Sequence, residues 1–534
     1  MSETSLPAQE TKGFLGWVEK TGNKLPDPVF IFFYLIILLV GISVLADLLN
    51  VSAEHPTQIN SDGTPKVENA VSLFAPENIQ RLWVDMPKTF THFHPLGYVL
   101  VVMLGAGVAE RSGLFASAIR GAVRGAPTAL LTPLVALVAM LSNHAADAGY
   151  VVMIPLAAII FASAGRHPMA GIAAAFAGVS GGFSANISPG QLDALLFGIT
   201  ETAYETSNID IGWTMNIAGN WYFIAALLLI YLPVIWYVTD RVIEPRLGKW
   251  VPDEGADTKS YGDEDAPLKP EQKKGLRYAG LAVLGVCALW ALMTFGPGTP
   301  LLNDGPGTEN DPWYTVAGPF FRSLVAAFLV LFLAAGWAYG AAANTINNHR
   351  DLVDMMAEAM KDLGYYLVLA FAAAHFVAMF GWSNLGLITA VHGADAIQSS
   401  GLPLPLVLGM IVLFSALLNL FVGSASAKWA LLAPVLVPML MLLGVSPEGA
   451  TAAYRVGDGA TNIITPLMVY FPLILVFAQR WTKGFGLGSL TAMMIPYSIW
   501  MLITGVLLMM GWLYLGLPLG PGAPAQIAIP GVGG

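Results

Sequence analysis

Apolar runs about as long as a bilayer is thick recur along the whole chain. The cleanest covers residues 30–49 and carries no charge before Asp47. A helix needs about 20 predominantly apolar residues to cross the hydrocarbon core. Only 11% of the 534 residues are charged, whereas soluble domains carry roughly 25%. We therefore expect an all-α polytopic membrane protein, because runs of this length are too long for the strands of a membrane barrel.

The apolar runs divide into nine predicted transmembrane helices and two longer stretches. The stretches at 127–165 and 403–444 exceed one crossing and carry polar residues in the middle. Polar backbone at membrane depth is tolerated only when it is buried in protein or lines a wet cavity, so each stretch is predicted to be a re-entrant hairpin. The predicted spans are 28–49, 95–120, 169–200, 214–238, 276–296, 316–340, 365–391, 450–480 and 489–518.

The distribution of basic residues predicts the orientation of these spans. With a cytoplasmic N-terminus, lysine and arginine collect in the inner loops, as the positive-inside rule requires. The short outer segments contain neither residue, and they cover 201–212, 297–315, 392–402 and 445–449. Only the long first outer loop, about 50–94, departs from the rule. The pattern predicts that the C-terminus, a flexible tail at 519–534, lies on the outer side. The expected location is the inner membrane of a bacterium, with the C-terminus in the periplasm.

Several classes of function find no support in the sequence. No basic stretch of the kind that binds nucleic acid is present, and the single Cys287 lies in an apolar run, which leaves no disulfide framework. The motifs GxxxxGK[ST] and HExxH are missing, which disfavours an ATP-driven pump and a zinc enzyme. An intramembrane enzyme and a channel stay as alternatives from other classes. No cofactor is expected beyond a possible sodium ion.

A duplication is the strongest signal in the chain: a polar hairpin followed by a helix that breaks. In each copy, a run of small residues ends in a hydroxyl residue and a proline. The first copy ends in Ser188 and Pro189, and the second ends in Thr465 and Pro466. Proline removes a backbone donor and glycine lowers helix stability, so both segments are predicted to unwind within the membrane.

Unwinding within the membrane exposes backbone carbonyls and amides, to which polar side chains add oxygens. One hairpin is predicted to open from the cytoplasm and the other from outside, which gives the repeats inverted topology. Secondary transporters with a midplane site between repeats show this pattern, and two helices kinked only for packing are the alternative. The residues predicted to serve ion coupling at this site are Asp193, Asn143, Asn186, Asn462, Thr465 and Ser188.

Charges within the predicted helices mark the candidate substrate site, because intramembrane charge is costly. We expect Arg455 and Lys428 to meet a substrate carboxylate and Trp429 to stack on an aromatic ring. Asp193 and Asp458 are candidates for coupling to a proton or cation. Simpler explanations exist: Arg455 and Asp458, three residues apart, could pair with each other, Lys428 could snorkel, and Trp429 could be a packing residue. No basic residue lies near Asp193 in the sequence.

At these positions the chain resembles the AbgT family of p-aminobenzoyl-glutamate transporters. The motifs that carry the resemblance lie nearly end to end, at 22–28, 142–147, 188–193, 424–429 and 454–458. The resemblance implies that the substrate path includes Asp193, Ser426, Trp429, Pro447, Arg455, Asp458 and Pro466.

The resemblance also implies a homodimer with an elevator-type fold similar to divalent-anion/sodium symporters. Members of the family import p-aminobenzoyl-glutamate or export p-aminobenzoate-like antimetabolites, including sulfonamides. The implied function is secondary active transport of such anionic aromatic compounds, driven by a proton or sodium gradient. A sodium-coupled dicarboxylate symporter is the alternative. The predicted parts are an N-terminal segment (1–94), repeat 1 (95–240), a loop with scaffold spans (241–364), repeat 2 (365–518) and the tail.

Overall fold

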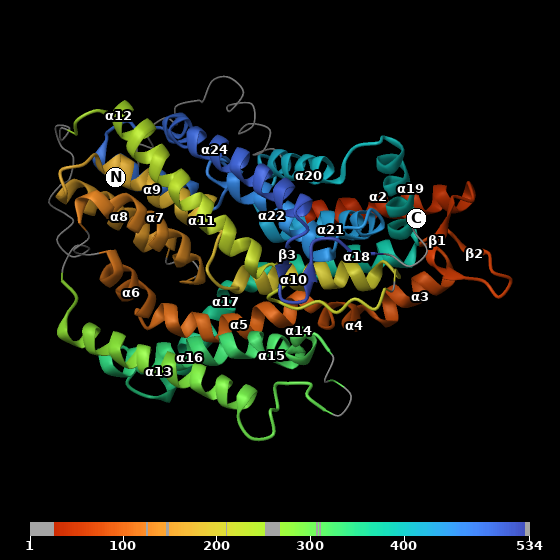
Figure 1. Cartoon of the computed structure of the whole chain (residues 1–534), viewed down its shortest axis with the longest axis horizontal. Coiled ribbons are helices and arrows are strands. Elements are labelled where there is room, and N and C mark those ends of the chain that lie inside the picture. Colours follow the sequence, from red (N-terminus) through yellow and green to blue (C-terminus); the bar gives the residue numbers. More distant parts are fainter. Residues whose placement is uncertain are drawn as a thin grey trace, which may run out of the picture.

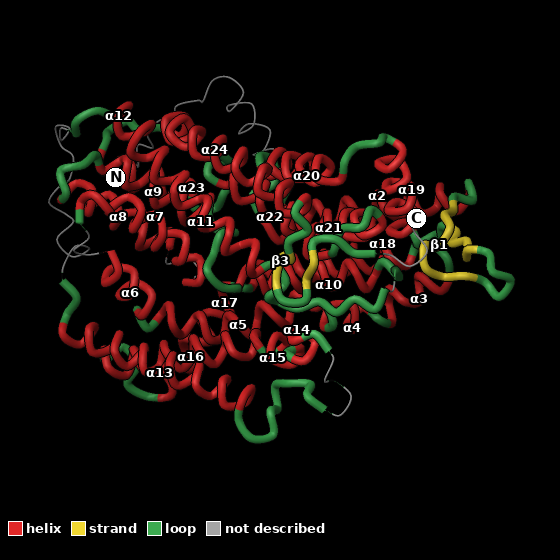
Figure 2. Tube along the Cα trace, in the orientation of Figure 1, coloured by secondary structure: helices red, strands yellow, loops and turns green. Residues whose placement is uncertain are grey.

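The computed structural model describes residues 26–123, 127–145, 149–209, 211–250, 267–305, 308 and 311–528. The start of the motif at 22–28, the last residues of the first hairpin turn at 146–147 and the end of the tail at 529–534 lie outside the described residues. Helices dominate the described part, and the strands form two small antiparallel pairs, as Figure 2 shows.

A layer of three long helices lies along one side of the molecule (Figure 1). It consists of α13 (Pro270–Phe295), α16 (Leu324–Ala343) and α5 (His94–Arg111). Small residues set the spacing of this layer. A Cβ added at Gly105 would lie 2.4 Å from the carbonyl oxygen of Leu329, so α5 and α16 approach with backbone almost in contact. Glycine is required where two backbones come this close.

Two predicted spans are bent or divided. The span at 95–120 consists of α5 and α6 (Leu114–Val123), which meet at an angle of 63°. Gly113 between them has φ 88°, a left-handed conformation that favours glycine. The span at 365–391 divides at Asn384, also left-handed with φ 57°, into α18 (Gly364–Trp382) and α19 (Leu385–Ser399). The prediction of one continuous helix was wrong in both places.

The first polar stretch and its broken helix form a series of short helices. These are α7 (Leu131–Leu141), a 3-10 turn (Ser142–Ala145), a π-helical turn (Gly149–Met153), α8 (Ile154–Ser163), α9 (Pro168–Phe176) and a second π-helical turn (Ala177–Gly181). The chain is not helical from 182 to 190, and α10 (Gln191–Thr206) follows. The predicted break before Pro189 is therefore confirmed.

The second copy has simpler geometry. It consists of α20 (Leu404–Asn419), α21 (Ala425–Leu442), α22 (Pro447–Asn462) and α23 (Phe471–Trp481). The helix breaks at 463–470 around Pro466, as predicted. The helical turns that precede the two breaks lie side by side, because a Cβ at Gly459 would be 3.0 Å from the carbonyl oxygen of Gly181. The rings of Tyr150 and Tyr470 also stack between the copies, with centroids 4.3 Å apart.

The remaining elements surround this core. The longer helices are α2 (Pro28–Leu48), α11 (Trp221–Tyr237) with a π-helical extension (Val238–Ile243), α17 (His349–Asp362) and α24 (Leu487–Tyr514). The short ones are α3 (Pro76–Val84), α4 (Met86–Thr91), a 3-10 turn (Thr128–Leu130), α12 (Glu244–Leu247), α14 (Trp313–Val316) and α15 (Gly318–Arg322). The predicted span at 316–340 therefore comprises parts of α14 and α16 with α15 between them.

The C-terminal segment is folded as far as it is described, so the prediction of a flexible tail was wrong for residues 519–528. Strand β3 (Pro518–Gly520) pairs with β4 (Ala523–Pro524), and Gln526 bridges to Val445. Leu519 is completely buried. A Gly/Pro/Ala composition suggested disorder, but apolar side chains and these backbone bonds hold the segment in place. The other pair, β1 (Ser52–Ile59) with β2 (Pro65–Asn69), projects from one end (Figure 1).

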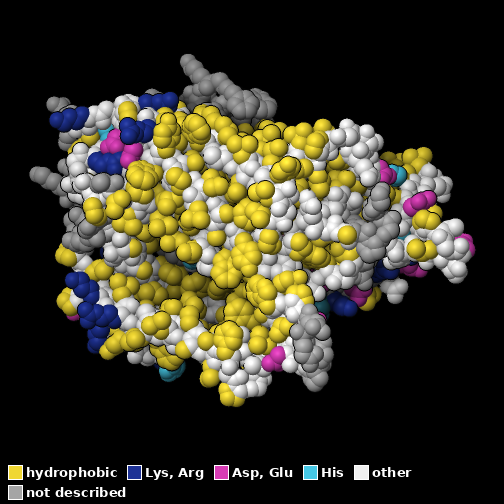
Figure 3. All heavy atoms as spheres, in the orientation of Figure 1, with side chains coloured by type: hydrophobic (Ala, Val, Ile, Leu, Met, Phe, Trp, Pro, Cys, Tyr) yellow, Lys and Arg dark blue, Asp and Glu magenta, His cyan; other side chains and the backbone are white. Residues whose placement is uncertain are grey.

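Seven helices of the described part are long and apolar enough to cross a membrane, or eight if the bent pair α5 and α6 is one span. One of the seven is α21, which was predicted to be half of a hairpin. The two broken helices are made of shorter pieces, so the count of nine spans with two hairpins stays a prediction. Figure 3 shows hydrophobic side chains over most of one face, with lysine and arginine gathered at the end that holds α6 and α12.

Candidate functional site

An ion pair joins the two broken helices at the centre of the core. Arg455 of α22 donates from Nη1 to Oδ1 of Asp193 over 2.8 Å, and both side chains are buried. Asp193 lies in the first turn of α10, where its second oxygen accepts the backbone N–H of Gly190 at 2.8 Å. The positive end of the helix dipole and the guanidinium together stabilise this carboxylate.

A second ion pair lies within repeat 2. Lys428, in the first turn of α21, is bonded to Asp458 of α22, with side-chain exposures of 2% and 0%. The suggested pairing of Arg455 with Asp458 is therefore wrong, although the two share a helix. The idea that Lys428 snorkels toward water is wrong as well, because the ammonium group is enclosed. All of α22 is buried, so both pairs are held away from water.

Asn419, at the end of α20, connects this second pair to the break. Its Oδ1 accepts a hydrogen bond from Lys428, and its Nδ2 lies 2.7 Å from the carbonyl oxygen of Asp458. The same Nδ2 lies within 3.0 Å of the side-chain oxygens of Thr461 and Asn462. The predicted coupling residue Asn462 is thus tied to Asn419 at the helix end.

Trp429 is completely buried, and its ring already has an aromatic partner. It stacks on Tyr454 with centroids 4.6 Å apart and an interplanar angle of 23°. Its Nε1 donates to the hydroxyl of Thr200 at 2.9 Å, and that hydroxyl lies 2.8 Å from the hydroxyl of Thr451. The indole therefore bridges α21, α10 and α22. A substrate ring would have to insert beside this stack or replace part of it.

The other predicted residues lie around these pairs. The Ser426 hydroxyl is 3.3 Å from that of Ser424 at the start of α21, and Pro447 is the first residue of α22. Thr465 is buried in the second break, next to Pro466. The Ser188 hydroxyl in the first break is 3.4 Å from Nε2 of His144.

Several buried oxygens near the first break have no hydrogen-bond partner in the described structure. They belong to Ser184, Asn186 and Asn220, and Nε2 of Gln191 is also unpartnered. Such oxygens suit a hard cation such as sodium. The amide of Asn143, by contrast, donates to the carbonyl of Met140 at 2.9 Å. No cluster of three or more His, Cys, Asp or Glu ligands was found among the described residues.

The space at the Asp193–Arg455 pair is closed. A cavity of about 10 Å³ lies between α10, α22 and the segment at 215–220, and it is lined by both members of the pair and by Glu448. This is barely the volume of one water molecule. The structure thus presents the site with its charges paired to one another and without room for an organic substrate.

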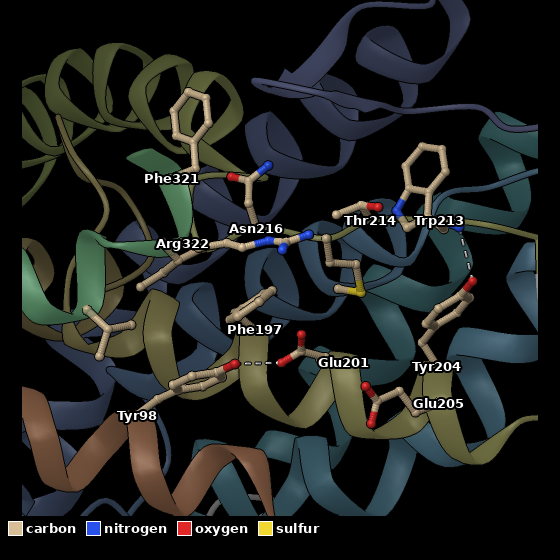
Figure 4. Close-up of a pocket in the computed structure, with 13 residues that line it drawn as sticks. Tyr98, Phe197, Glu201, Tyr204, Glu205, Trp213, Thr214, Asn216, Phe321 and Arg322 are labelled. Atoms are coloured by element: carbon tan, nitrogen blue, oxygen red, sulfur yellow. Dashed lines mark hydrogen bonds between the residues drawn. The ribbon is translucent and has the colours of Figure 1, made fainter. Parts of the chain in front are cut away.

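A second, open cavity of about 410 Å³ is separated from the small closed cavity by a wall of residues that line both (Figure 4). The carboxylates of Glu201 and Glu205 point into it from α10, and the Arg322 side chain extends across it. Tyr98 donates a hydrogen bond of 2.9 Å to Glu201. The two cavities share the wall residues Phe197, Met215, Asn216 and Ile217.

Comparison with known proteins places this arrangement in a family. The model of the AbgT putative transporter family matches residues 13–527. The chain belongs to this family. It is 37% identical to the p-aminobenzoyl-glutamate transport protein of Escherichia coli K12, over 98% of this chain and 99% of that one. The chain is therefore a membrane transporter and not an enzyme.

Two solved structures of the family have the same fold. The YdaH transporter of Alcanivorax borkumensis matches with a TM-score of 0.84 and 40% identity, over 93% of this chain and all of that one. The Neisseria gonorrhoeae protein MtrF, described within a class of antimetabolite efflux pumps, matches with a TM-score of 0.87 and 40% identity, over 96% of this chain and all of that one.

Sequence reasoning missed several residues of the network, namely Thr200, Asn419, Glu448, Thr451 and Tyr454. A signal for some of them was present: Glu448, Thr451 and Arg455 follow the i, i+3, i+7 spacing of one helix face, as do Asp193 and Thr200 at i, i+7. Polar residues at this spacing give each of the two helices one polar face. Two such faces would have indicated that the helices pack against each other there.

Proposed function

We propose that the chain is a secondary active transporter of p-aminobenzoyl-glutamate or p-aminobenzoate-like compounds, including sulfonamide antimetabolites. The observation that carries this proposal is the buried network in which Arg455 and Lys428 each hold a carboxylate beside the Trp429–Tyr454 stack. These groups match the chemistry of an aromatic carboxylate. The two relatives named for p-aminobenzoyl-glutamate transport and antimetabolite efflux support the same substrate class.

In this proposal Asp193 occupies the position on Arg455 that a substrate carboxylate takes during transport. A guanidinium forms paired hydrogen bonds with a carboxylate, and Nε of Arg455 has no partner among the described residues. Substrate binding then replaces one carboxylate by another, which leaves Asp193 in need of a proton or a cation. Transport is thereby linked to a proton or sodium gradient, with the oxygens at the first break as the candidate sodium ligands.

Further parts of the proposal concern architecture. We propose that the chain has nine spans and two inverted hairpins, and that its N-terminus lies in the cytoplasm at the inner membrane. We also propose that it forms a homodimer and that the broken helices move like an elevator against the α5–α13–α16 layer. Their support is the charge bias of the sequence and the arrangement of that layer along one side of the broken helices, where α5 packs against α10 (Figure 1). A sodium-coupled dicarboxylate symporter is the alternative substrate class, and the Trp429–Tyr454 stack favours aromatic substrates over it.

The proposal is tested by binding of p-aminobenzoate and of its uncharged amide to purified protein. The wild type should bind the acid at least tenfold more tightly than the amide, because only the acid can pair with Arg455. Arg455→Met should abolish this preference, while a conservative change elsewhere in the core, Leu440→Met, should keep it. Equal binding of acid and amide by the wild type would refute the assignment of the carboxylate site.

A further inference from the structure

Glu448 differs from every other deeply buried carboxylate that the structure describes. Three carboxylate residues are less than 9% exposed, namely Asp193, Glu448 and Asp458. Asp193 is paired with Arg455 and Asp458 with Lys428, whereas Glu448 has no cationic partner among the described residues. Its side-chain partner is Nε1 of Trp213, which lies 3.2 Å and 3.1 Å from its two oxygens. A carboxyl group buried without a cation is stable mainly in its neutral, proton-bound form.

The position of Glu448 connects the open cavity with the central ion pair. Glu448 lines the small closed cavity together with Asp193 and Arg455. On the other side, Trp213 lines the open cavity and donates to Glu448. Arg455 follows Glu448 by seven residues on the same face of α22, which is about 10 Å along the helix. Glu201 and Glu205 line the same open cavity as Trp213 (Figure 4).

Few other ionisable groups act on Glu448. Across the closed cavity, Asp193 and Arg455 neutralise one another. In the open cavity, Glu205 is bonded to His94 at 2.9 Å. The segment at 211–220 and the C-terminal strands that pack beside it contribute neutral side chains in the described structure. Arg322 is a fixed positive charge that lines the open cavity, but it forms no ion pair with Glu448 in the described structure. No cation is therefore bonded to Glu448 among the described residues.

We propose that Glu448 is the group that carries the coupling proton, and that the cavity of Glu201 and Glu205 connects it to water. This rests on the proposed function. When a substrate carboxylate takes Arg455, Asp193 loses its partner and accepts the proton of Glu448 through the water molecule that the closed cavity admits. Glu448 is left as a carboxylate and Asp193 as a neutral carboxyl, so charge and protons balance. Glu448 then takes a new proton from the open cavity.

Labelled p-aminobenzoate in proteoliposomes separates coupling from binding. One assay measures exchange of labelled for unlabelled substrate at equal pH, which needs no net proton movement. The other measures accumulation driven by an imposed pH gradient. Glu448→Gln should lose at least tenfold in pH-driven accumulation. It should lose less in exchange, because a cycle without net proton movement needs no proton to enter or leave Asp193, and Arg455 is still present to hold the carboxylate. The control Glu358→Gln, on the exposed helix α17, should change neither rate.

The outcomes distinguish this inference from the proposed function. If the wild-type protein does not exchange p-aminobenzoate, both the proposed function and the role of Glu448 are refuted. If the wild type exchanges substrate but accumulates it only with a sodium gradient, the role of Glu448 alone is refuted. The same holds if Glu448→Gln accumulates substrate within twofold of the wild type. If Glu448→Gln does not fold, Trp213→Phe tests the same idea, since it keeps the carboxyl and removes the donor that favours its ionised form. The pH at half-maximal accumulation should then rise by about one unit, and an unchanged pH profile contradicts the proposal.

Discussion

The pairing of Arg455 with Asp193, and not with Asp458, makes a quantitative prediction for a double-mutant cycle. The substitutions are Arg455→Met, Asp193→Asn and Asp458→Asn. Asparagine at 193 keeps an oxygen for the backbone N–H of Gly190, which the aspartate accepts at 2.8 Å. Each single substitution leaves one buried charge without its partner.

The expected size follows from burial. The side chains of Arg455 and Asp193 are 2% and 6% exposed, so water screens their interaction little. Breaking a buried ion pair by removing one partner costs about 3–5 kcal/mol, because the remaining charge is uncompensated. The Arg455→Met/Asp193→Asn double variant has no such charge, so it should be no less stable than either single variant. This amounts to a coupling energy of about 3 kcal/mol or more, whereas residues 455 and 458 should couple by less than about 1 kcal/mol.

Unfolding in mixed detergent and SDS micelles, followed by tryptophan fluorescence, measures the four stabilities of each cycle. The reasoning is refuted if the losses at Arg455 and Asp193 simply add. It is also refuted if Arg455 couples more strongly to Asp458 than to Asp193.

Two further predictions concern packing and pH. Gly457→Ala should destabilise the protein by about 1–3 kcal/mol, because the new Cβ would lie 2.1 Å from the carbonyl oxygen of Val412. The control Gly280→Ala has open space around the new Cβ and should be neutral or stabilising in the same unfolding assay. The second prediction concerns His55, whose Nδ1 accepts backbone N–H hydrogen bonds and whose Nε2 lies 3.1 Å from the carbonyl oxygen of Asn208. Burial lowers the pKa of this imidazole. Since a lowered pKa means that protonation opposes the folded contact, this contact should be fully stable above about pH 6.5 and weaken as pH falls through the folded pKa. Hydrogen exchange at residues 52–58 should then be faster at low pH, and exchange protection independent of pH would contradict this role.

The sequence predicted where the helices break but not which charges pair. Proline and glycine disrupt a helix at their own positions, so the breaks before Pro189 and Pro466 could be located from the sequence alone. The partner of Arg455 lies 262 residues away, and helix periodicity identifies only residues that share a face. It therefore offered Asp458 as a partner, when the packing of α10 against α22 brings Asp193 instead.

Glu448 escaped notice for a similar reason. An acid directly after a proline at a helix start is common, because it stabilises the positive end of the helix dipole. Its isolation from any described cation becomes visible only when α22 is enclosed by its neighbours. The bends at Gly113 and Asn384 were also hidden, since an apolar run shows where a membrane segment lies but not whether it is straight.

The central claim is that the Arg455–Asp193 pair gives way to the carboxylate of an aromatic substrate during coupled transport. Flux of labelled p-aminobenzoyl-glutamate and p-aminobenzoate into proteoliposomes, with imposed proton or sodium gradients, tests it most directly. The account predicts gradient-driven accumulation by wild type and loss of at least tenfold in Arg455→Met for both substrates. The account would be contradicted if wild-type flux were independent of both gradients. It would also be contradicted if the Arg455→Met variant accumulated substrate as well as the wild type does.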